Sequence, residues 1–342
     1  MRALLIGGTG NISSHITRQL AEDKDWEVWL LNRGNKSGAL PDSVYVINAD
    51  INDEELAGRK LDCMTFDVVA DFIAYTPDQV ERDIRLFEGR IGQYIFISTA
   101  SAYQKPLSNY LVTESTPLAN PFWQYSRDKI ACEDVLIRRY RENGFPVTIV
   151  RPSHTYGDYH IPVSVSGTKG PWPVLERMRA GKPVIVNGDG ASLWTVTHSS
   201  DFARAFIGLM GNAHAIGEAV QITSDETLSW DQIYKIIGRC LGVEPELVHI
   251  ASDYLVALRP EIRGNLLGDK SHSVVFDNTK LKRLVPGFHA GTRFDQGVAK
   301  SIANFMDNPA LRVADPAFDQ WCDKVIAEYL GGLDRLRSTI TY

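Results

Sequence analysis

The sequence predicts an α/β fold, a doubly wound parallel sheet with a smaller, interleaved C-terminal portion. Apolar runs of strand length alternate with segments of helical periodicity from the first residues to about residue 151. This pattern is typical of a parallel sheet covered by helices on both faces. A glycine-rich turn follows the first run. Beyond residue 151 the alternation loosens, which predicts a second portion of different build.

The individual elements follow from this alternation. Strands are expected at residues 3–6, 27–31, 44–49, 66–73, 93–98, 147–151 and 220–223, and helices at residues 11–22, 79–87, 126–143, 175–180, 202–210 and 230–241. The last hundred residues mix short helices with proline-marked turns. We expect one domain over 1–160, to which 186–225 return, and a C-terminal substrate-binding portion made of 161–185 and 226–342.

Composition excludes several classes of function. The net charge of −6 argues against a nucleic-acid partner, because phosphate binding needs clustered basic residues. No apolar run approaches the roughly 18–20 residues that span a bilayer, and none resembles a signal-peptide core. The four cysteines form no CxxC pair and the eight histidines no HxxxH pair, so no metal is expected. These features predict a cytoplasmic protein without a membrane partner.

The loop Gly7-Gly8-Thr9-Gly10-Asn11-Ile12 joins the first strand to the first helix. Glycines allow a tight turn and the close approach of a pyrophosphate, and the start of a helix offers N–H groups to it. The loop therefore predicts a Rossmann-type domain that binds a nicotinamide dinucleotide. Ser13 stands where the third glycine of this motif is usual, and its small side chain should still allow the helix to pack on the strand.

The end of the second strand indicates which dinucleotide is bound. An acidic residue there favours NAD, whereas this chain has Asn32 and Arg33, followed by Asn35, Lys36 and Ser37. This neutral-to-basic set suits a 2′-phosphate and favours NADP over NAD. An alternative is that Arg33 only stacks on the adenine, which fits either cofactor.

Asp50 and Ile51 follow the third strand and are also expected to contact the cofactor. The Asp50 carboxylate could accept a hydrogen bond from the adenine amino group. An alternative is that Asp50 only caps the next turn.

Tyr125 and Lys129 stand four residues apart at the start of an expected helix, which places both side chains on one face. A lysine ammonium there would stabilise a phenolate, so Tyr125 could exchange a proton with a substrate oxygen while hydride moves to or from the nicotinamide. Lys129 could also hold the nicotinamide ribose. Because such a pair arises by chance in many chains, the alternative is a surface helix with an aromatic residue near its start.

Thr99 lies just past the fifth strand, and sites in doubly wound sheets form beyond the carboxyl ends of strands. Its hydroxyl could bind the reacting oxygen beside the tyrosine. Ser98 or Ser101 could supply this hydroxyl instead, or all three residues could only form a turn.

Several ordered motifs together resemble the extended short-chain dehydrogenases/reductases of the NAD-dependent epimerase/dehydratase type. The segment from Ser98 to Tyr103 is similar to the family's S-[ST]-x-x-x-Y segment, and Tyr125 with Lys129 matches its YxxxK pair. The remaining matches are Arg151-Pro152-Ser153-His154-Thr155-Tyr156-Gly157 for RPxxxYG, Gly188-Asp189-Gly190 with His198 and Asp201 for GDG…H…D, and Val275-Phe276-Asp277 for the C-terminal strand.

The resemblance assigns further site residues. It implies that Ser98, Pro152 and Ser153 contact the cofactor, together with Tyr125 and Lys129, and that Thr99 carries the catalytic hydroxyl. Tyr103, His154 and Trp194 are the expected substrate contacts. His198 is more often a core residue of its motif, and Asp201 is expected to cap the following helix.

Two departures from the family pattern bear on the substrate. Trp194 stands where members that act on nucleotide sugars carry an arginine for the diphosphate, and it can stack on a ring or simply pack under the cleft. Ala100-Ser101 stands where dehydratases carry Asp-Glu, which disfavours dehydration.

The resulting hypothesis is an NAD(P)-dependent reductase or epimerase that acts at a secondary alcohol or ketone carbon of a small, sugar-like substrate, and the choice between the two reactions stays open. The alternative is a non-catalytic member, an NAD(P)-sensing regulator or RNA-binding protein, because the Asn32-Arg33-Gly34 stretch is similar to that of chloroplast stem-loop RNA-binding proteins. The retained tyrosine–lysine pair and the acidic charge favour the enzyme. A homodimer is the default expectation for this family.

Overall fold

The structure, a computed structural model, describes residues 1–34 and 40–340 and forms two compact units. The first unit comprises Met1–Thr155, Thr195–Glu226 and Val274–Thr292, and the second comprises Tyr156–Trp194, Thr227–Ser273 and the chain from Arg293. Asn35, Lys36 and Ser37 lie outside the described residues.

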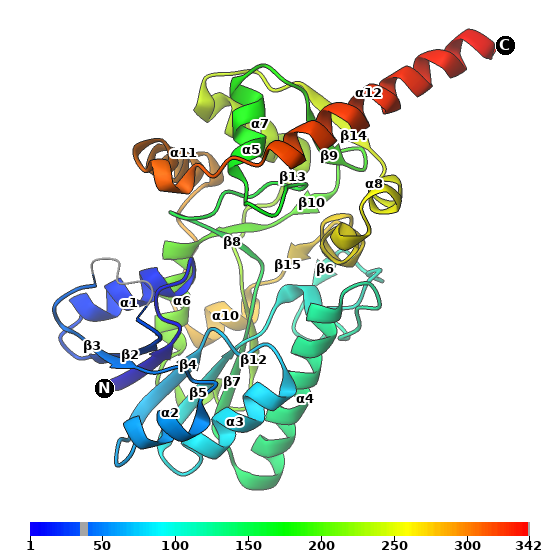
Figure 1. Cartoon of the computed structure of the whole chain (residues 1–342). Helices are drawn as coiled ribbons and strands as arrows, with labels where there is room; N and C mark the ends of the chain where they lie inside the picture. Colours follow the sequence, from blue (N-terminus) through cyan, green and yellow to red (C-terminus); the bar gives the residue numbers. More distant parts are fainter. Residues whose placement is uncertain (35–39, 341–342) are drawn as a thin grey trace. The chain divides into compact units, whose positions relative to one another are not determined.

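A seven-stranded parallel sheet forms the centre of the first unit (Figure 1), with the strand order β12-β7-β5-β4-β1-β2-β3. Its strands are β1 (Arg2–Ile6), β2 (Glu27–Asn32), β3 (Val44–Asn48), β4 (Phe66–Asp71), β5 (Ile91–Ile97), β7 (Val147–Pro152) and β12 (Ala219–Ile222). The strand order reverses between β1 and β4, the place where open α/β sheets bind ligands at their carboxyl edge.

Helices cover both faces of this sheet. One face packs against α2 (Glu54–Lys60), α3 (Pro77–Phe87) and α4 (Gln124–Asn143), and the other against α1 (Ser13–Glu22), α6 (Ser199–Leu209) and α10 (Thr279–Leu284). Along β1, Leu4 and Ile6 face the first layer while Ala3 and Leu5 face the second. Strands buried on both faces are apolar throughout, which explains their continuous apolar runs. The predicted fold class is confirmed.

Residues from the C-terminal third complete the first unit. It also contains η1 (Ala100–Ala102), β6 (Leu111–Val112), β8 (His154–Tyr156, whose last residue belongs to the second unit), β11 (Val196–His198), η2 (Ala213–Ala215) and β15 (Val275–Phe276). The expectation that 226–342 lie wholly in the C-terminal portion is therefore wrong for Val274–Thr292, because β15 pairs with β6 and α10 packs on β12. Residues 186–194, expected in the first domain, lie in the second unit, where β9 pairs with β14.

The second unit is built mainly of helices around α7. Its elements are α5 (Trp172–Arg179), β9 (Val184–Asn187), β10 (Leu193–Trp194), β13 (Leu228–Ser229), α7 (Trp230–Leu241), β14 (Leu247–Ile250), α8 (Ser252–Leu258), η3 (Pro260–Ile262), α9 (Arg263–Asn265), η4 (Leu266–Lys270), α11 (Phe294–Asp307), η5 (Pro309–Leu311) and α12 (Pro316–Thr339). Trp230 and Tyr234 of α7 are fully buried.

The long helix α12 was not expected from the proline-marked pattern. Pro316 occupies its first turn, where proline starts a helix rather than breaking one, and the Asp315 side chain accepts a hydrogen bond from the backbone N–H of Phe318. Within the described residues, no helix combines the length and the apolarity needed to cross a bilayer.

A buried ion pair fastens α4 to the sheet of the first unit. Arg151 on β7 donates to both carboxylate oxygens of Glu133 on α4, at 3.0 and 2.6 Å, and the Ser98 hydroxyl donates to the same carboxylate. Burial alone would lower the pKa of the Arg151 guanidinium. The hydrogen bonds and the negative charge of Glu133 have the larger combined effect, so the pKa is raised. The Arg151 guanidinium therefore stays charged at neutral pH, and the two buried side chains depend on each other.

Replacing Arg151 by methionine leaves Glu133 buried without its counter-charge. We expect Arg151→Met to lower the free energy of unfolding by about 3–5 kcal/mol, because a half-removed buried pair is strongly destabilising. Urea unfolding followed by circular dichroism measures this loss in the free energy of unfolding. The control is Arg59→Gln, which breaks the exposed Arg59–Glu55 pair and should cost less than about 0.5 kcal/mol. Equal losses in the two variants would contradict the expectation.

Candidate functional site

The glycine-rich loop turns at a position that only glycine suits. Gly7 has φ +80°, and its N–H donates to the carbonyl of Leu31 at the end of β2, at 3.2 Å. A Cβ atom on Gly7 would lie 2.7 Å from Ile73, and one on Gly8 would lie 2.4 Å from Leu30. The loop backbone therefore lies in direct contact with Ile73 and Leu30. A tight glycine turn of this kind lets a pyrophosphate approach the backbone closely.

Ser13, the departure from the usual motif, holds the loop together. Its hydroxyl donates to the Gly7 carbonyl at 2.7 Å and accepts the Gly10 N–H at 2.9 Å. Ser13 is buried at the start of α1. The serine therefore adds two hydrogen bonds inside the turn, so its role goes beyond being small enough to pack.

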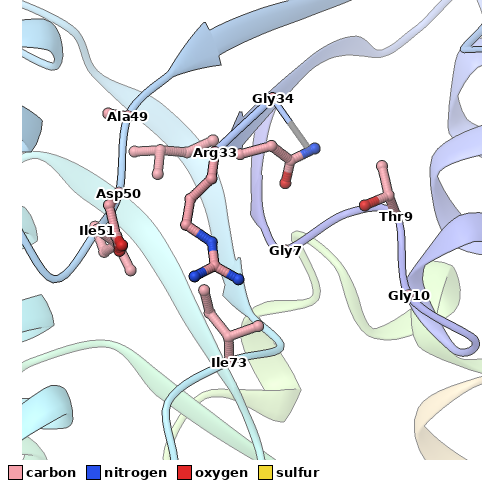
Figure 2. A pocket seen from close by; sticks show the side chains of 11 residues that line it. Gly7, Thr9, Gly10, Arg33, Gly34, Ala49, Asp50, Ile51 and Ile73 are labelled. Carbon is pink, nitrogen blue, oxygen red and sulfur yellow. The ribbon is translucent and has the colours of Figure 1, made fainter. Parts of the chain in front are cut away.

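A pocket opens where this loop meets the ends of β2 and β3 (Figure 2). Its lining residues include seven that the sequence predicted: Gly7, Thr9, Gly10, Asn32, Arg33, Asp50 and Ile51. It also includes Leu31, Gly34, Ala49 and Ile73. The exposed Arg33 side chain extends from the end of β2 into the pocket toward Ile73. Backbone glycines, an arginine and a carboxylate around one pocket fit the adenosine and pyrophosphate of a dinucleotide.

Other predicted cofactor residues lie around this loop without lining the pocket. Gly8 is buried behind the turn, Ile12 packs against the core beside α1, and Asn11 donates to the Thr155 carbonyl at 3.2 Å. Asp50 both lines the pocket and caps a turn, because one carboxylate oxygen accepts the backbone and side-chain N–H groups of Asn52, each at 3.0 Å.

The carboxylate of Asp71, which sequence reasoning missed, fixes the far wall of the pocket. It closes β4 and accepts the backbone N–H groups of Ile73 and Ala74, at 2.5 and 2.9 Å. Arg82 lies 3.5 Å from this carboxylate and 2.7 Å from that of Asp83. Burial and the neighbouring Asp71 raise the pKa of Asp83 well above its usual range. The available signal was an acidic residue at the end of an otherwise apolar strand.

Lys129 is held from two sides, one helical turn after Tyr125 on α4. Its ammonium donates to the carbonyls of Ala74 and Ile97, at 2.7 and 2.6 Å, and lies 4.6 Å from the centre of the Tyr75 ring. The distance to the Tyr125 ring centre is 5.9 Å. Burial lowers the pKa of Lys129 to about 8. Its charge is therefore present at neutral pH and easily lost above it.

Thr99 and Tyr125 are the partly exposed members of the predicted catalytic set. Thr99 follows β5 and caps η1, while Tyr125 lies in the first turn of α4 and contacts the rings of Trp123 and Tyr75, at 5.0 and 6.3 Å between centres. The Ser98 hydroxyl instead points to Glu133. Ser98, one of the alternatives to Thr99 as the hydroxyl that binds the reacting oxygen, therefore joins the end of β5 to α4 instead.

Two other predictions need correction. Tyr103, expected to contact substrate, has no exposed surface, and its hydroxyl donates to Gln221 at 2.9 Å. It is a structural residue, and burial raises the pKa of its phenol. The expected cap of α6 is wrong, because the ring of His198 accepts the Ser200 N–H while Asp201 binds Thr292.

The remaining predicted residues lie in separate units. Pro152 is buried at the end of β7, Ser153 shares a hydrogen bond of 3.1 Å with Thr197, and His154 begins β8 in the first unit. Trp194 belongs to the second unit, where it is buried against Trp230 with 5.5 Å between ring centres. Within its own unit Trp194 has the packing role that was the alternative to stacking on a ligand.

The sheet order, the glycine turn and the tyrosine–lysine pair define an extended short-chain dehydrogenase/reductase. The family model for the NAD dependent epimerase/dehydratase family matches residues 3–223, and the chain belongs to this family.

Curated relatives and solved structures agree with this membership. The chain is 25% identical to 2′-dehydrokanamycin reductase of Streptomyces kanamyceticus over 84% of its own length and 80% of that protein. It is 26% identical to the chloroplast stem-loop binding protein of 41 kDa b of Arabidopsis thaliana, over 72% of this chain and 65% of that one. An epimerase of Methanothermobacter thermautotrophicus has the same fold, with a TM-score of 0.75 at 17% identity, over 91% and 94% of the two chains.

A side chain at Gly7 should disturb the pocket more than it disturbs the fold. We expect Gly7→Ala to weaken dinucleotide binding at least about tenfold, because Ile73 must move into the pocket to make room. Gly89→Ala is the matched control, since Gly89 has φ +73° but open space around it. Both variants should lose about 1 kcal/mol of stability from backbone strain. Calorimetric titration with NADPH and with NADH separates them, and equal affinities in the two variants would refute this use of the loop.

Proposed function

We propose that the chain is an NAD(P)-dependent oxidoreductase or epimerase that acts at a secondary alcohol or ketone carbon of a small, sugar-like substrate, with Tyr125 as the acid and base. The observation that carries the proposal is the placement of Lys129. Two backbone carbonyls hold its ammonium 5.9 Å from the Tyr125 ring centre, at the carboxyl edge of the sheet. A structural lysine would not need to be buried beside a partly exposed tyrosine.

The residues divide the work as follows. When bound, the nicotinamide supplies or accepts the hydride. Tyr125 gives a proton to the substrate oxygen in reduction and takes it in oxidation, and the Lys129 charge stabilises the phenolate that results. The Thr99 hydroxyl hydrogen-bonds the same oxygen. Because the pKa of Lys129 is about 8, most of this support is present at neutral pH, and it is lost as the pH rises through 8.

The substrate is proposed to be a sugar-like ketone or alcohol without a nucleotide diphosphate. Relatives include enzymes named for UDP- and dTDP-sugars and one named for the reduction of 2′-dehydrokanamycin. Trp194 stands where an arginine for the diphosphate would be expected. Ala100-Ser101 lacks the carboxylates that water elimination needs, so reduction or epimerisation is favoured over dehydration.

Tyr125→Phe tests the assignment directly. With the best ketone from a panel of free keto-sugars, nucleotide-linked keto-sugars and 2′-dehydrokanamycin, we expect kcat to fall by about a hundredfold or more, because the proton donor is lost. Absorbance of NADPH follows net reduction, and product stereochemistry with retained cofactor identifies epimerisation. A change within about twofold, or no turnover of any panel member by the unmodified protein, would contradict the proposal.

The cofactor is proposed to be NADP rather than NAD. No acidic residue closes β2, and the Arg33 side chain extends into the pocket (Figure 2). An arginine can bind a phosphate through two parallel hydrogen bonds. Related dehydratase and epimerase structures contain bound NAD, so the proposal of NADP rests on the residues at the end of β2 in this chain.

Arg33→Ala should reverse this preference. We expect the ratio of the Kd for NAD to that for NADP to fall about tenfold or more, because only NADP loses a charge-assisted contact. Arg141→Ala, which removes an exposed arginine at the end of α4, should leave the ratio unchanged. If Arg33→Ala weakens the binding of both dinucleotides equally, then Arg33 stacks on the adenine and does not bind the 2′-phosphate.

A further inference from the structure

Three hydroxyl groups form a continuous row of hydrogen bonds between Thr99, which follows β5, and the helix that carries Tyr125. The oxygens of Thr99 and Ser101 are 3.0 Å apart, and those of Ser101 and Ser126 are 2.7 Å apart. Ser101 is 3% exposed and Ser126 is fully buried, whereas Thr99 is partly exposed. The chain therefore has one buried end, beside Tyr125 on α4, and one end at the site.

The surroundings of Ser101 hold this chain in place. Its N–H donates to the Thr99 hydroxyl oxygen at 3.2 Å, and its carbonyl accepts from the buried Asn120 side chain at 2.8 Å. The two residues thus keep a fixed separation, and the Ser101 side chain stays pointed at α4. The hydroxyl protons can still rotate about their C–O bonds.

Each hydroxyl has a single proton, so the direction of donation along the three hydroxyl groups decides whether Thr99 can donate a hydrogen bond to a ligand. If Thr99 donates to Ser101, its proton is used and Thr99 can only accept from a ligand. If Ser126 donates to Ser101 and Ser101 donates to Thr99, the Thr99 oxygen accepts two hydrogen bonds, one from a hydroxyl and one from an N–H. Its own proton is then directed at the site.

We propose that Ser101 and Ser126 are positioning residues that orient the Thr99 proton toward the substrate oxygen, an inference that rests on the proposed function. With a ketone bound, the order of donation is Ser126 to Ser101 to Thr99 to the carbonyl oxygen. Aligned hydrogen bonds polarise one another, so Thr99 becomes a better donor to the negative charge that develops during hydride addition.

The same chain serves the alcohol when it runs in the other direction. Hydride adds to carbon and Tyr125 supplies the proton to oxygen, so the product is a neutral alcohol whose new O–H can donate to Thr99. Thr99 then donates to Ser101, and Ser101 to Ser126. Every proton stays on its own oxygen, and only rotations occur. In this direction the Ser126 proton points away from Ser101.

This role separates Ser101 from the carboxylate that dehydratases of the family carry in this region. A serine hydroxyl does not ionise at neutral pH, so Ser101 cannot remove a proton from carbon. It can only pass on the orientation of a hydrogen bond. The chain suits the interconversion of a ketone and an alcohol, and it does not suit water elimination.

A double-mutant cycle tests the proposal. Ser101→Ala should lower kcat about tenfold with KM changed less than about twofold, which is the loss of one hydrogen bond felt in the transition state. In a Thr99→Val background the same change should have almost no further effect, because Ser101 acts only through Thr99. Ser126→Ala should behave in the same way with a smaller loss.

Ser301→Ala is the control for removing a buried hydroxyl. Ser301 donates to the Gly297 carbonyl within α11 of the second unit, and kcat should not change. If Ser101→Ala lowers kcat by the same factor in the Thr99→Val background as in the unmodified protein, the serine only fastens η1 to α4 and the proposal is wrong. A kcat unchanged by Ser101→Ala would overturn it as well.

Tyr125→Phe run alongside separates this proposal from the function on which it rests. If Tyr125→Phe is inactive and the Ser101 and Thr99 effects do not multiply, both stand. If Tyr125→Phe is inactive and Ser101→Ala resembles the unmodified protein, only the hydroxyl chain is wrong. If Tyr125→Phe keeps full activity, the proposed function is wrong, and the proposed role of the three hydroxyl groups is wrong with it.

Discussion

The Asp71 carboxylate is the contact on which the site depends. By accepting the N–H groups of Ile73 and Ala74, it bends the chain after β4 at the place where the strand order reverses. Ile73 then lines the dinucleotide pocket and limits residue 7 to glycine, while the Ala74 carbonyl receives the Lys129 ammonium. One buried carboxylate therefore sets the distance between the cofactor pocket and the helix that carries Tyr125 and Lys129.

That carboxylate is tolerable in the core because of the charges around it. Arg82 lies between Asp71 and Asp83 and also donates to the Asn52 side chain, whose amide group in turn donates to Asp50. Removing carboxylates from water is costly unless charges and hydrogen bonds compensate them. The network extends from the pocket-lining Asp50 to the turn that holds Lys129, so packing and ligand geometry are linked by the same few polar groups.

Much of this arrangement could be predicted from side-chain pattern, and the failures have physical causes. Apolar runs, the Gly7 turn and the spacing of Tyr125 and Lys129 are local properties of the chain, and the structure confirms the sheet and the turn that they indicate. The Ala74 and Ile97 carbonyls that bind Lys129 leave no sequence signal, because every residue has a carbonyl. The burial of Tyr103 depends on Gln221, more than a hundred residues away, which no local pattern can predict.

The return of Val274–Thr292 to the first unit has a consequence for how the protein forms. Gln221 on the edge strand β12 donates to the Asp277 carbonyl at 2.7 Å, and β15 pairs with β6. Three stretches of chain, separated by segments of the other unit, must meet before the dinucleotide-binding unit is whole. On the ribosome, that unit stays incomplete until about residue 292 has emerged, long after its glycine turn and tyrosine–lysine helix. A nascent chain paused before that point would leave exposed the apolar sheet face that Leu281 and its neighbours on α10 cover.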